Sequence, residues 1–413
     1  MTSITLVTPL RPGRLLAIAA LLFSAPAVWA DAVTEWNLRA GEFVTASGLI
    51  TQPACRVMAI THTAAFEAAN AITRRYPSAA ASRLEAPADA SVEAAIAAAH
   101  RGALARLLPL QESAIDVAYK KALAAIADGA AKEAGIAVGE RAALDVLARR
   151  ADDGAVAPES YRPATTAGRY VPTAIPATPQ WSQRKPWLMS SGAQFRPGPP
   201  PALASAQWAR DYNEVKAFGS KQSSARSAEQ TDIARFWTTT LPPIYHGVVR
   251  SVAEQPGREL MRNARLFAAV TQAIDDAMIA VFDAKYHHAF WRPITAIRNG
   301  DLDGNEATER DASWTPFIDT PMHPEYPCAH CVQAGAVGAV LQAEIGAGPA
   351  PMLSTASASA NGAVRRWNSV DAFVQEVSNA RIYDGVHYRN STEVGTELGR
   401  RVGALAVQRL LSE

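Results

Sequence analysis

An apolar stripe between residues 264 and 285 does most to constrain the fold of this chain. In "ARLFAAVTQAIDDAMIAVFDAK", large apolar side chains recur at steps of four residues, at Leu266, Val270, Ile274, Met278 and Phe282. This spacing places them on one face of an α-helix. Ala-rich segments such as "TQPACRVMAITHTAAFEAANAI" show helical spacing too, and the alternation typical of β-strands is nearly absent. We therefore predict an all-α protein.

The first thirty residues have the pattern of an export signal. Arg11 and Arg14 precede the apolar stretch "LLAIAALLFSAPAVWA", and Val28 and Ala30 suit cleavage by a signal peptidase. We expect residues 1–30 to be removed, because the apolar core is short for the alternative, an uncleaved membrane anchor. No later stretch is apolar enough to span a membrane. The mature chain is therefore expected to be secreted or periplasmic.

The net charge limits the partners that can be expected, and the cysteine content limits the possible disulfide bonds. The formal net charge is +1, so nucleic acid is not an expected partner. The three cysteines are Cys55, Cys328 and Cys331, and an odd number leaves one unpaired in an exported chain. We expect the close pair Cys328 and Cys331 to form a disulfide and Cys55 to be a buried thiol.

The proline content divides the mature chain. Of the 27 prolines, ten fall between residues 155 and 202, which predicts a long irregular connection. We predict a helical region over residues 31–202 that ends in this Pro-rich connection, and a C-terminal helical bundle over residues 203–413. A connection of this length either covers part of the molecule or links two lobes.

Three cations stand close to the ends of predicted helices in the C-terminal half. Lys285 falls on or beside the buried face of the first stripe, where it needs an anion unless its ammonium reaches the helix end. Arg292 precedes a proline, so it sits where a helix runs out. Arg381 is on the apolar face of a later helix. Three cations suit a tetrahedral or trigonal oxyanion.

Two histidines are predicted beside the same anion. Pro327 suits the first position of a helix, and this places His330 on the core side of its first turn, where free backbone N–H groups favour an anion. A second helix breaks at Asp384 and Gly385, and His387 follows the break. Two such histidines suit one nucleophile or metal-oxide ligand and one general acid/base.

These residues, in this order, resemble a known signature. Lys-x6-Arg-Pro, Pro-x-x-His and Arg-x5-His are similar to the three-part signature of the vanadium-dependent haloperoxidases, which the type 2 phosphatidic acid phosphatases and bacterial acid phosphatases share. "KYHHAFWRPITAIR" and "ARIYDGVHYRNSTEVGTELGRRVG" look like the bacterial haloperoxidase-like branch, and "HTAAFEAANAI" looks like its N-terminal half. The resemblance covers most of the mature chain and implies two helical bundles with the site in the second.

The resemblance also implies roles for single residues. It implies a vanadate cofactor, with phosphate as a competing oxyanion, and oxidation of halide by hydrogen peroxide. His387 would be the vanadium ligand and His330 the acid/base. His323 stands where algal bromoperoxidases have a second active-site histidine, so it would be a halide-side or proton-relay residue unless it is an ordinary loop histidine. A homo-oligomer is compatible with this reading. The cofactor oxygens would be held by Lys285, Arg292, Cys328, Ala329 and Arg381.

Two departures from the signature keep other functions open. The family usually has Pro-Ser-Gly-His, whereas this chain has Cys328 and Ala329 in the middle positions, and a thiol is a weak donor that a disulfide would remove. Phosphatases tend to have an aspartate four residues after the second histidine, where Ser391 would orient His387 more weakly. The alternatives are a metal-independent acid phosphatase that attacks a phosphomonoester through His387, and a periplasmic oxyanion-binding protein without turnover.

Other readings of the same residues are weaker. A redox dithiol at Cys328 and Cys331 would need a βαβ setting that the flanks do not provide. The spacing of the histidines and cysteines matches no closed zinc site. In "DLDGNEATERD", Gly304 comes two positions too early for an EF-hand, so we expect a turn-rich loop over the mouth of the pocket.

Overall fold

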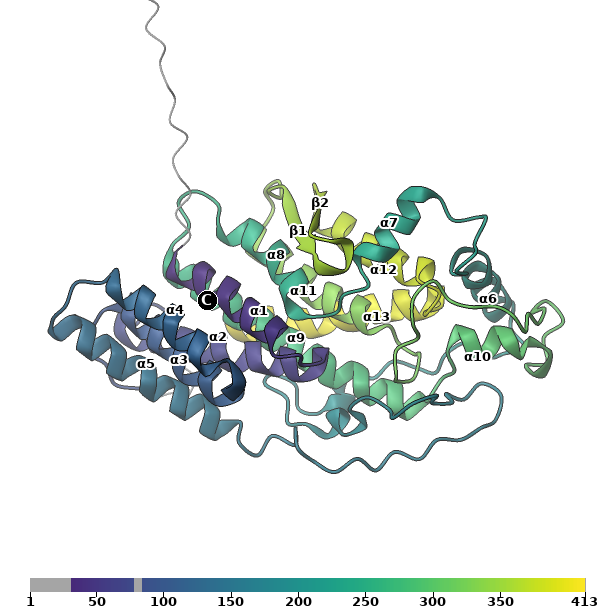
Figure 1. Ribbon diagram of the computed structural model, residues 1–413, viewed down its shortest axis with the longest axis horizontal. Helices are drawn as coiled ribbons and strands as arrows, with labels where there is room; N and C mark the ends of the chain where they lie inside the picture. The colour runs from purple at the N-terminus through teal and green to yellow at the C-terminus, as the bar shows by residue number, and fades with distance from the viewer. Residues whose placement is uncertain (1–30, 78–83, 413) are drawn as a thin grey trace, which may run out of the picture.

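The structure of the chain is a computed structural model that describes residues 31–77 and 84–412. Helices dominate it (Figure 1), and the all-α prediction is confirmed. The predicted export signal falls in residues 1–30, outside the described residues. None of the helices in the described part of the chain is both long and apolar enough to cross a membrane.

Five helices form the N-terminal part. Asp31 and Ser91 cap α1 and α3, because each side chain accepts a hydrogen bond from the backbone N–H three residues on. Gly135 and Gly139 let α5 approach the backbone of α3 so closely that a Cβ at either position would collide with it. These helices are α1 (Ala32–Ala46), α2 (Thr51–Thr73), α3 (Val92–Leu107), α4 (Glu112–Ala124) and α5 (Ala130–Arg149).

Eight further helices and one hairpin follow the Pro-rich connection. The helices are α6 (Ala206–Phe218), α7 (Ala228–Phe236), α8 (Pro242–Ala253), α9 (Leu260–His288), α10 (Pro293–Arg298), α11 (Ala329–Ile345), α12 (Val370–Tyr383) and α13 (Arg389–Ala406). The hairpin pairs β1 (Leu353–Ser357) with β2 (Ala363–Trp367) in antiparallel fashion, and Leu353 lies opposite Trp367. It packs against α8 at the surface and does not change the fold class.

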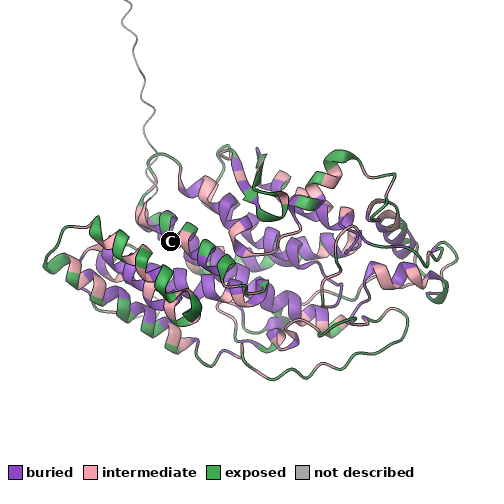
Figure 2. Cartoon of the chain, viewed as in Figure 1, coloured by how far each residue is buried: buried purple, intermediate pink, exposed green. Residues whose placement is uncertain are grey.

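Helix α9 is the centre of the molecule. The five apolar residues of its predicted stripe are all buried, and α9 packs against α2 as well as against α11 and α13. Figure 2 shows the buried surface running along the inner helices from one end of the molecule to the other. One hydrophobic core extends from Val33 to Ala406. The boundary between residues 202 and 203 stays a prediction.

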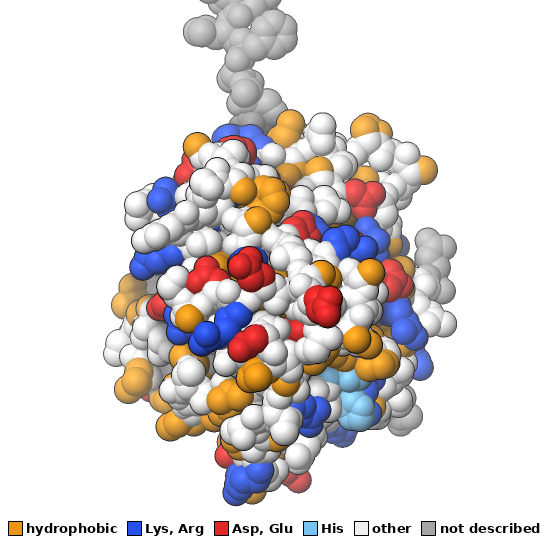
Figure 3. Space-filling view, turned by 90° about the vertical axis from the view of Figure 1, so that its right-hand side faces the viewer, with side chains coloured by type: hydrophobic (Ala, Val, Ile, Leu, Met, Phe, Trp, Pro, Cys, Tyr) orange, Lys and Arg blue, Asp and Glu red, His pale blue; other side chains and the backbone are white. Residues whose placement is uncertain are grey.

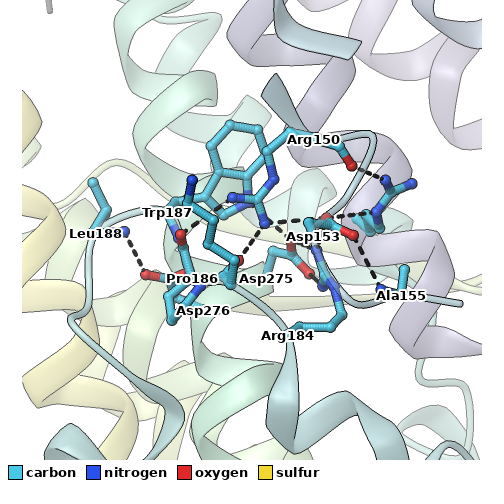
Figure 4. A network of polar contacts seen from close by, with 11 residues as sticks. Arg150, Asp153, Ala155, Arg184, Pro186, Trp187, Leu188, Asp275 and Asp276 are labelled. Carbon is cyan, nitrogen blue, oxygen red and sulfur yellow. Dashed lines mark hydrogen bonds and ion pairs between the residues drawn. The ribbon is translucent and has the colours of Figure 1, made fainter. Parts of the chain in front are cut away.

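A buried polar network, which we call the clasp, fastens the Pro-rich connection to α9 (Figure 4). It consists of Arg56, Arg150, Asp153, Arg184, Trp187, Asp275 and Asp276. Arg184 donates to Asp275 Oδ1 and to Asp153 Oδ2, each over 2.7 Å. Asp276 accepts the backbone N–H groups of Trp187 at 2.7 Å and of the two following residues at 2.8 and 3.1 Å.

The rest of the connection lies along two segments that lead to the predicted site. Tyr170 N donates to Ala289 O over 2.7 Å, and Ala177 N donates to Met322 O over 2.6 Å. The connection therefore both links the two parts of the chain and covers the end of α9, because its own backbone donors are satisfied by these segments.

Candidate oxyanion site

The predicted site residues come together where α9, α11 and α12 meet. Lys285 is in the last turn of α9 and Arg292 caps α10. His330 is in the first turn of α11, Arg381 is in the last turn of α12, and His387 follows the break after α12. All five are buried, whereas His323 is half-buried at the edge. The left-handed conformation of Ala289, the cap of α9, turns the chain from Lys285 toward Arg292.

Lys285 is a buried cation that binds no carboxylate in the structure. Its Nζ donates to Pro324 O over 2.9 Å and to Glu325 O over 2.8 Å, and the side chain is fully buried. An ammonium has three N–H groups, so one remains for a ligand. Burial, and next the charge of Arg292, lower the pKa of Lys285 well below its usual value. An anion bound beside it would restore its charge and remove this cost.

Arg292 connects the two histidines on either side of it. Its Nη1 lies 3.3 Å from His387 Nε2, and its Nη2 lies 3.0 Å from His323 Nδ1. A guanidinium can only donate, so both of these ring nitrogens accept. Burial lowers the pKa of Arg292 to about 10, and it therefore stays charged at neutral pH.

His387 is held as a neutral imidazole with a defined tautomer. Its Nδ1 lies 2.7 Å from Glu325 Oε1. Because Nε2 accepts from Arg292, the proton is on Nδ1 and is donated to Glu325. Burial, and then the charges of Arg292 and Lys285, lower the pKa of His387 well below its usual value. The ring is therefore neutral at neutral pH, and the Nε2 lone pair accepts only a long hydrogen bond from Arg292, which a ligand would have to replace.

Glu325 is the functional residue that sequence reasoning missed. It is fully buried, and its Oε1 also accepts the backbone N–H of Tyr388 over 3.1 Å. Burial raises the pKa of Glu325 to about 7, although the charges of Lys285 and Arg292 oppose this. Ser391 Oγ lies farther from His387 Nδ1, at 3.4 Å. Ser391 is thus only a weak orienting residue, and the main one is a carboxylate from another segment, which occupies that edge of the ring.

A sequence signal for Glu325 did exist. It is the acid in "HPEYPCAH", two residues after His323 and five before His330. However, 62 residues separate Glu325 from His387, and nothing in a single sequence links two positions so far apart.

Arg381, Asp384 and His330 form the other half of the site. Arg381 Nη1 donates to Trp237 O over 2.9 Å and forms a close ion pair with Asp384 Oδ2. Among the described residues, three buried atoms of this half have no partner, namely Arg381 Nε, Asp384 Oδ1 and His330 Nε2. Burial, and next the charge of Arg381, lower the pKa of His330 well below its usual value, so its ring is neutral.

The start of α11 corrects one prediction and confirms another. The helix begins at Ala329 and not at Pro327, because Cys328 is extended and its Sγ caps the turn by accepting from Cys331 N over 3.3 Å. Cys328 and Cys331 form a disulfide and Cys55 is a buried free thiol, as expected. Cys328 thus offers no S–H donor, and its amide donates to Ser391 O. The amide of Ala329 remains, since a first-turn N–H has no acceptor within its helix.

This set of donors fits an oxyanion. Lys285, Arg292 and Arg381 supply three positive charges, and Lys285 Nζ, Arg381 Nε and His330 Nε2 keep hydrogen-bonding capacity for a ligand. The imidazole of His387 is neutral, and its Nδ1–H is donated to Glu325, so its Nε2 carries the lone pair. Within residues 31–77 and 84–412 no group of three His, Cys, Asp or Glu side chains could hold a metal ion. Vanadate, an anionic oxide that needs a single histidine ligand, fits these residues, and so does phosphate.

The surface near this end of the molecule has no single sign of charge. In Figure 3, which shows the side that carries α6 and α10, basic and acidic side chains are interspersed with apolar ones. This mixed surface agrees with the near-neutral composition.

Comparisons with known proteins agree with this geometry. Residues 265–412 match the family model described as the VCPO second helical-bundle domain. The chain is 29% identical over 176 residues to the vanadium chloroperoxidase of Curvularia inaequalis. This match covers 35% of the chain and 28% of the fungal enzyme, so it spans less than a third of that relative.

Solved structures extend the likeness to most of the chain. The first bacterial vanadium-dependent iodoperoxidase has 24% identity and a TM-score of 0.78, and the match covers 91% of this chain and 96% of that one. A holo-type bacterial vanadium-dependent chloroperoxidase has 16% identity and a TM-score of 0.69, with 88% and 94% covered. By fold over most of its described length, and by sequence in its C-terminal bundle, this chain is similar to the vanadium-dependent haloperoxidases.

Proposed function

We propose that the protein is a vanadate-dependent haloperoxidase-like enzyme that oxidises halide with hydrogen peroxide. The observation that carries this proposal is the state of His387. Its Nδ1–H is donated to Glu325 over 2.7 Å, so the Nε2 lone pair faces the cationic cluster and can bind the vanadium of vanadate. Vanadate, when bound, would activate peroxide toward attack by halide.

The chain's own residues would do the rest of the work. Lys285, Arg292 and Arg381 would hold the oxygens and withdraw negative charge, since fixed cations in a buried site need no reorganisation. The amide of Ala329 would add one neutral donor. His330 Nε2 has no protein partner and can take up or deliver a proton at the ligand.

His323 is suited to proton exchange with solvent. It is half-buried, and its Nδ1 lies 3.0 Å from Arg292 Nη2 and 3.2 Å from Pro324 O. The ring of Phe282 packs beside it with a centroid distance of 5.1 Å. We propose that His323 relays protons between solvent and the buried site.

The second candidate function is a metal-independent phosphatase. The Glu325–His387 pair favours it, because a carboxylate that orients an imidazole also activates it as a nucleophile toward a phosphomonoester. A third candidate, an oxyanion-binding protein without turnover, is supported by the disulfide at Cys328, which removes a donor that the family signature has. A buried disulfide also agrees with a periplasmic or secreted location, which mass spectrometry of an exported protein that starts at Asp31 would test.

A paired assay on purified mature protein, with and without orthovanadate, separates these functions. One arm follows bromination of a phenol-type dye with peroxide, and the other follows hydrolysis of p-nitrophenyl phosphate. We expect vanadate-dependent bromination. Hydrolysis that vanadate suppresses would instead establish the phosphatase, and silence in both arms with vanadate bound would establish the binding protein.

The matched variants are Lys285→Ala and, as a surface control, Lys221→Ala. Lys285→Ala and His387→Ala should abolish vanadate binding, whereas Lys221, which is exposed, should tolerate replacement. If Lys285→Ala binds vanadate as tightly as the parent protein, the site has been placed wrongly.

A further inference from the structure

Among the described residues, Asp384, which is paired with the site residue Arg381, has a buried carboxylate oxygen without a partner. The residue is fully buried, and its Oδ2 is paired with Arg381 Nη1. Its Oδ1 has no hydrogen-bond donor among the described residues. A buried carboxylate oxygen without a donor is costly, so its presence calls for a donor that a ligand brings.

A fully deprotonated anion would bring no donor for Asp384 Oδ1 and would add negative charge beside it. Arg381 is one of the cations proposed to hold the oxyanion, so the anion and Asp384 share one guanidinium. Two negatively charged oxygens at that guanidinium repel each other unless one of them carries a proton. A protonated oxygen of the ligand would instead donate to Asp384 Oδ1.

We propose that Asp384 makes the site selective for tetrahedral oxyanions that carry a proton, such as hydrogenphosphate and hydrogenvanadate, over sulfate, which carries none. This inference rests on the proposed oxyanion site and adds its ligand specificity. Lys285, Arg292 and Arg381 cannot make the distinction, because hydrogenphosphate and sulfate have the same shape and the same charge. Telling them apart needs an acceptor for the ligand's proton, and Asp384 Oδ1 is a charged acceptor, whereas the Nε2 lone pair of His387 is neutral.

Asp384 suits this role better than the other buried acid does. Glu325 also has an oxygen without a partner, Oε2, but its Oε1 binds His387 at Nδ1. The anion would lie at Nε2, on the far side of the imidazole. Asp384, in contrast, binds a guanidinium that would itself contact the anion.

Titration calorimetry with sodium phosphate and sodium sulfate tests the proposal on the mature protein. The pH should be well above neutral, where both anions are divalent and only phosphate keeps a proton. Burial raises the pKa of Asp384 to about 7, so it is ionised there. We expect phosphate to bind more tightly than sulfate by roughly tenfold to a hundredfold, the value of a hydrogen bond to a charged group.

Asp384→Asn should remove this preference. The amide keeps a carbonyl oxygen for Arg381 and places an NH2 donor where Oδ1 was, so sulfate affinity should rise and phosphate affinity should fall until the two are nearly equal. Asp303→Asn is the matched control, because Asp303 is a buried acid that binds Trp208 and Thr308 outside the site. Its phosphate-to-sulfate ratio should equal that of the parent protein.

Three outcomes would overturn the inference. Equal affinities in the parent protein would show that no acceptor selects the ligand, and this comparison needs no variant to fold. A ratio unchanged in Asp384→Asn would remove Asp384 from the role. If phosphate, sulfate and orthovanadate all fail to bind, the proposed function fails as well, whereas binding of phosphate and sulfate with equal strength leaves the oxyanion site in place and defeats only its selectivity.

Discussion

Two buried polar clusters on α9 differ in how completely their carboxylates are paired, although the clasp leaves Arg150 Nε and Arg184 Nε without acceptors among the described residues. In the clasp, every carboxylate oxygen of Asp153, Asp275 and Asp276 accepts at least one hydrogen bond. Ten residues beyond Asp275, Lys285 contacts no carboxylate of the described residues, and within the same part of the chain oxygens of Glu325 and Asp384 have no donors.

The difference shows how to tell a buried polar cluster with a structural role from one with a functional role inside the same core. A paired cluster offsets the cost of burying its charges by itself, so it can hold segments together without help. An unpaired cluster is stable in the fold only because the surrounding helices enforce it, and a ligand supplies the missing partners. The clasp therefore fastens the connection, and the site is where a ligand is expected.

The largest expected effect is a loss of stability in a variant that breaks the clasp. Asp275→Ala leaves Arg184 without one of its two carboxylates in a buried place and should lower the free energy of unfolding by about 3–5 kcal/mol. Lys285→Met should cost much less, because it removes a buried charge that has no counter-ion. Urea denaturation of both variants measures the difference. If Lys285→Met were the more destabilising change, the site would have a structural role and the contrast would fail.

The next effect concerns the orientation of His387. Glu325→Gln removes the charge that fixes the imidazole, so vanadate affinity and turnover should both fall by roughly 10- to 100-fold. Titration with vanadate and steady-state rates measure this. Glu214→Gln is the control, because Glu214 forms an ion pair with Arg389 near the site but does not contact the site itself. An equal loss in both variants would mean that Glu325 has no special role.

The third prediction replaces the disulfide between Cys328 and Cys331 by a hydroxyl that can donate a hydrogen bond. Replacing Cys328 by Ser and Cys331 by Ala opens a short cross-link and should lower the free energy of unfolding by about 2 kcal/mol. The Ser hydroxyl stands where the family signature has one, so vanadate should bind roughly tenfold more tightly. Thermal melts with and without vanadate measure both effects. Unchanged affinity would place this side chain outside the ligand's reach.

The smallest effect concerns acid, and it contrasts the clasp with a buried histidine cluster formed by α1, α2, α3 and α8. There, Asn37 Nδ2 contacts both His62 Nε2 and His246 Nδ1, at 3.0 and 2.9 Å. Burial lowers the pKa of the neighbouring His100 to about 4 and that of His246 to about 3. The folded state keeps these rings neutral while the unfolded chain takes up protons below about pH 6.5, so stability is lost as the pH falls from there toward 4.

Each of these histidines should contribute a slope of about 1.4 kcal/mol per pH unit in that window. His100→Gln should flatten the dependence of unfolding free energy on pH by this amount. Asp153→Asn should leave the slope as it is above about pH 5, where an aspartate of the unfolded chain is ionised as well. Although burial opposes it, the charge of Arg184 helps to lower the pKa of Asp153 to about 2, so Asp153 stays ionised throughout the window. If the pH dependence of the unfolding free energy changed in Asp153→Asn and not in His100→Gln, the clasp would be the acid-sensitive part of the molecule.

Local patterns made the helices and half of the site predictable. The stripe ending at Phe282, the proline after Arg292 and the break after Asp384 each act within a few residues, so helix faces and ends could be read from the sequence. These faces place Lys285 and His330 in the interior. The start of α11 was misjudged by two residues, because Cys328 is extended and its Sγ caps the first turn.

The sequence by itself determined the fold class, the three cations and the two histidines, because periodicity and helix ends are local properties. Only the tertiary structure decided that Glu325 orients His387, that Asp384 shares Arg381, and that Arg184 joins Asp153 to Asp275. Most of these pairs join residues from different segments of the chain. The physical reason is that a buried charge is satisfied by whatever lies next to it in space, and one sequence does not show which distant residues become neighbours.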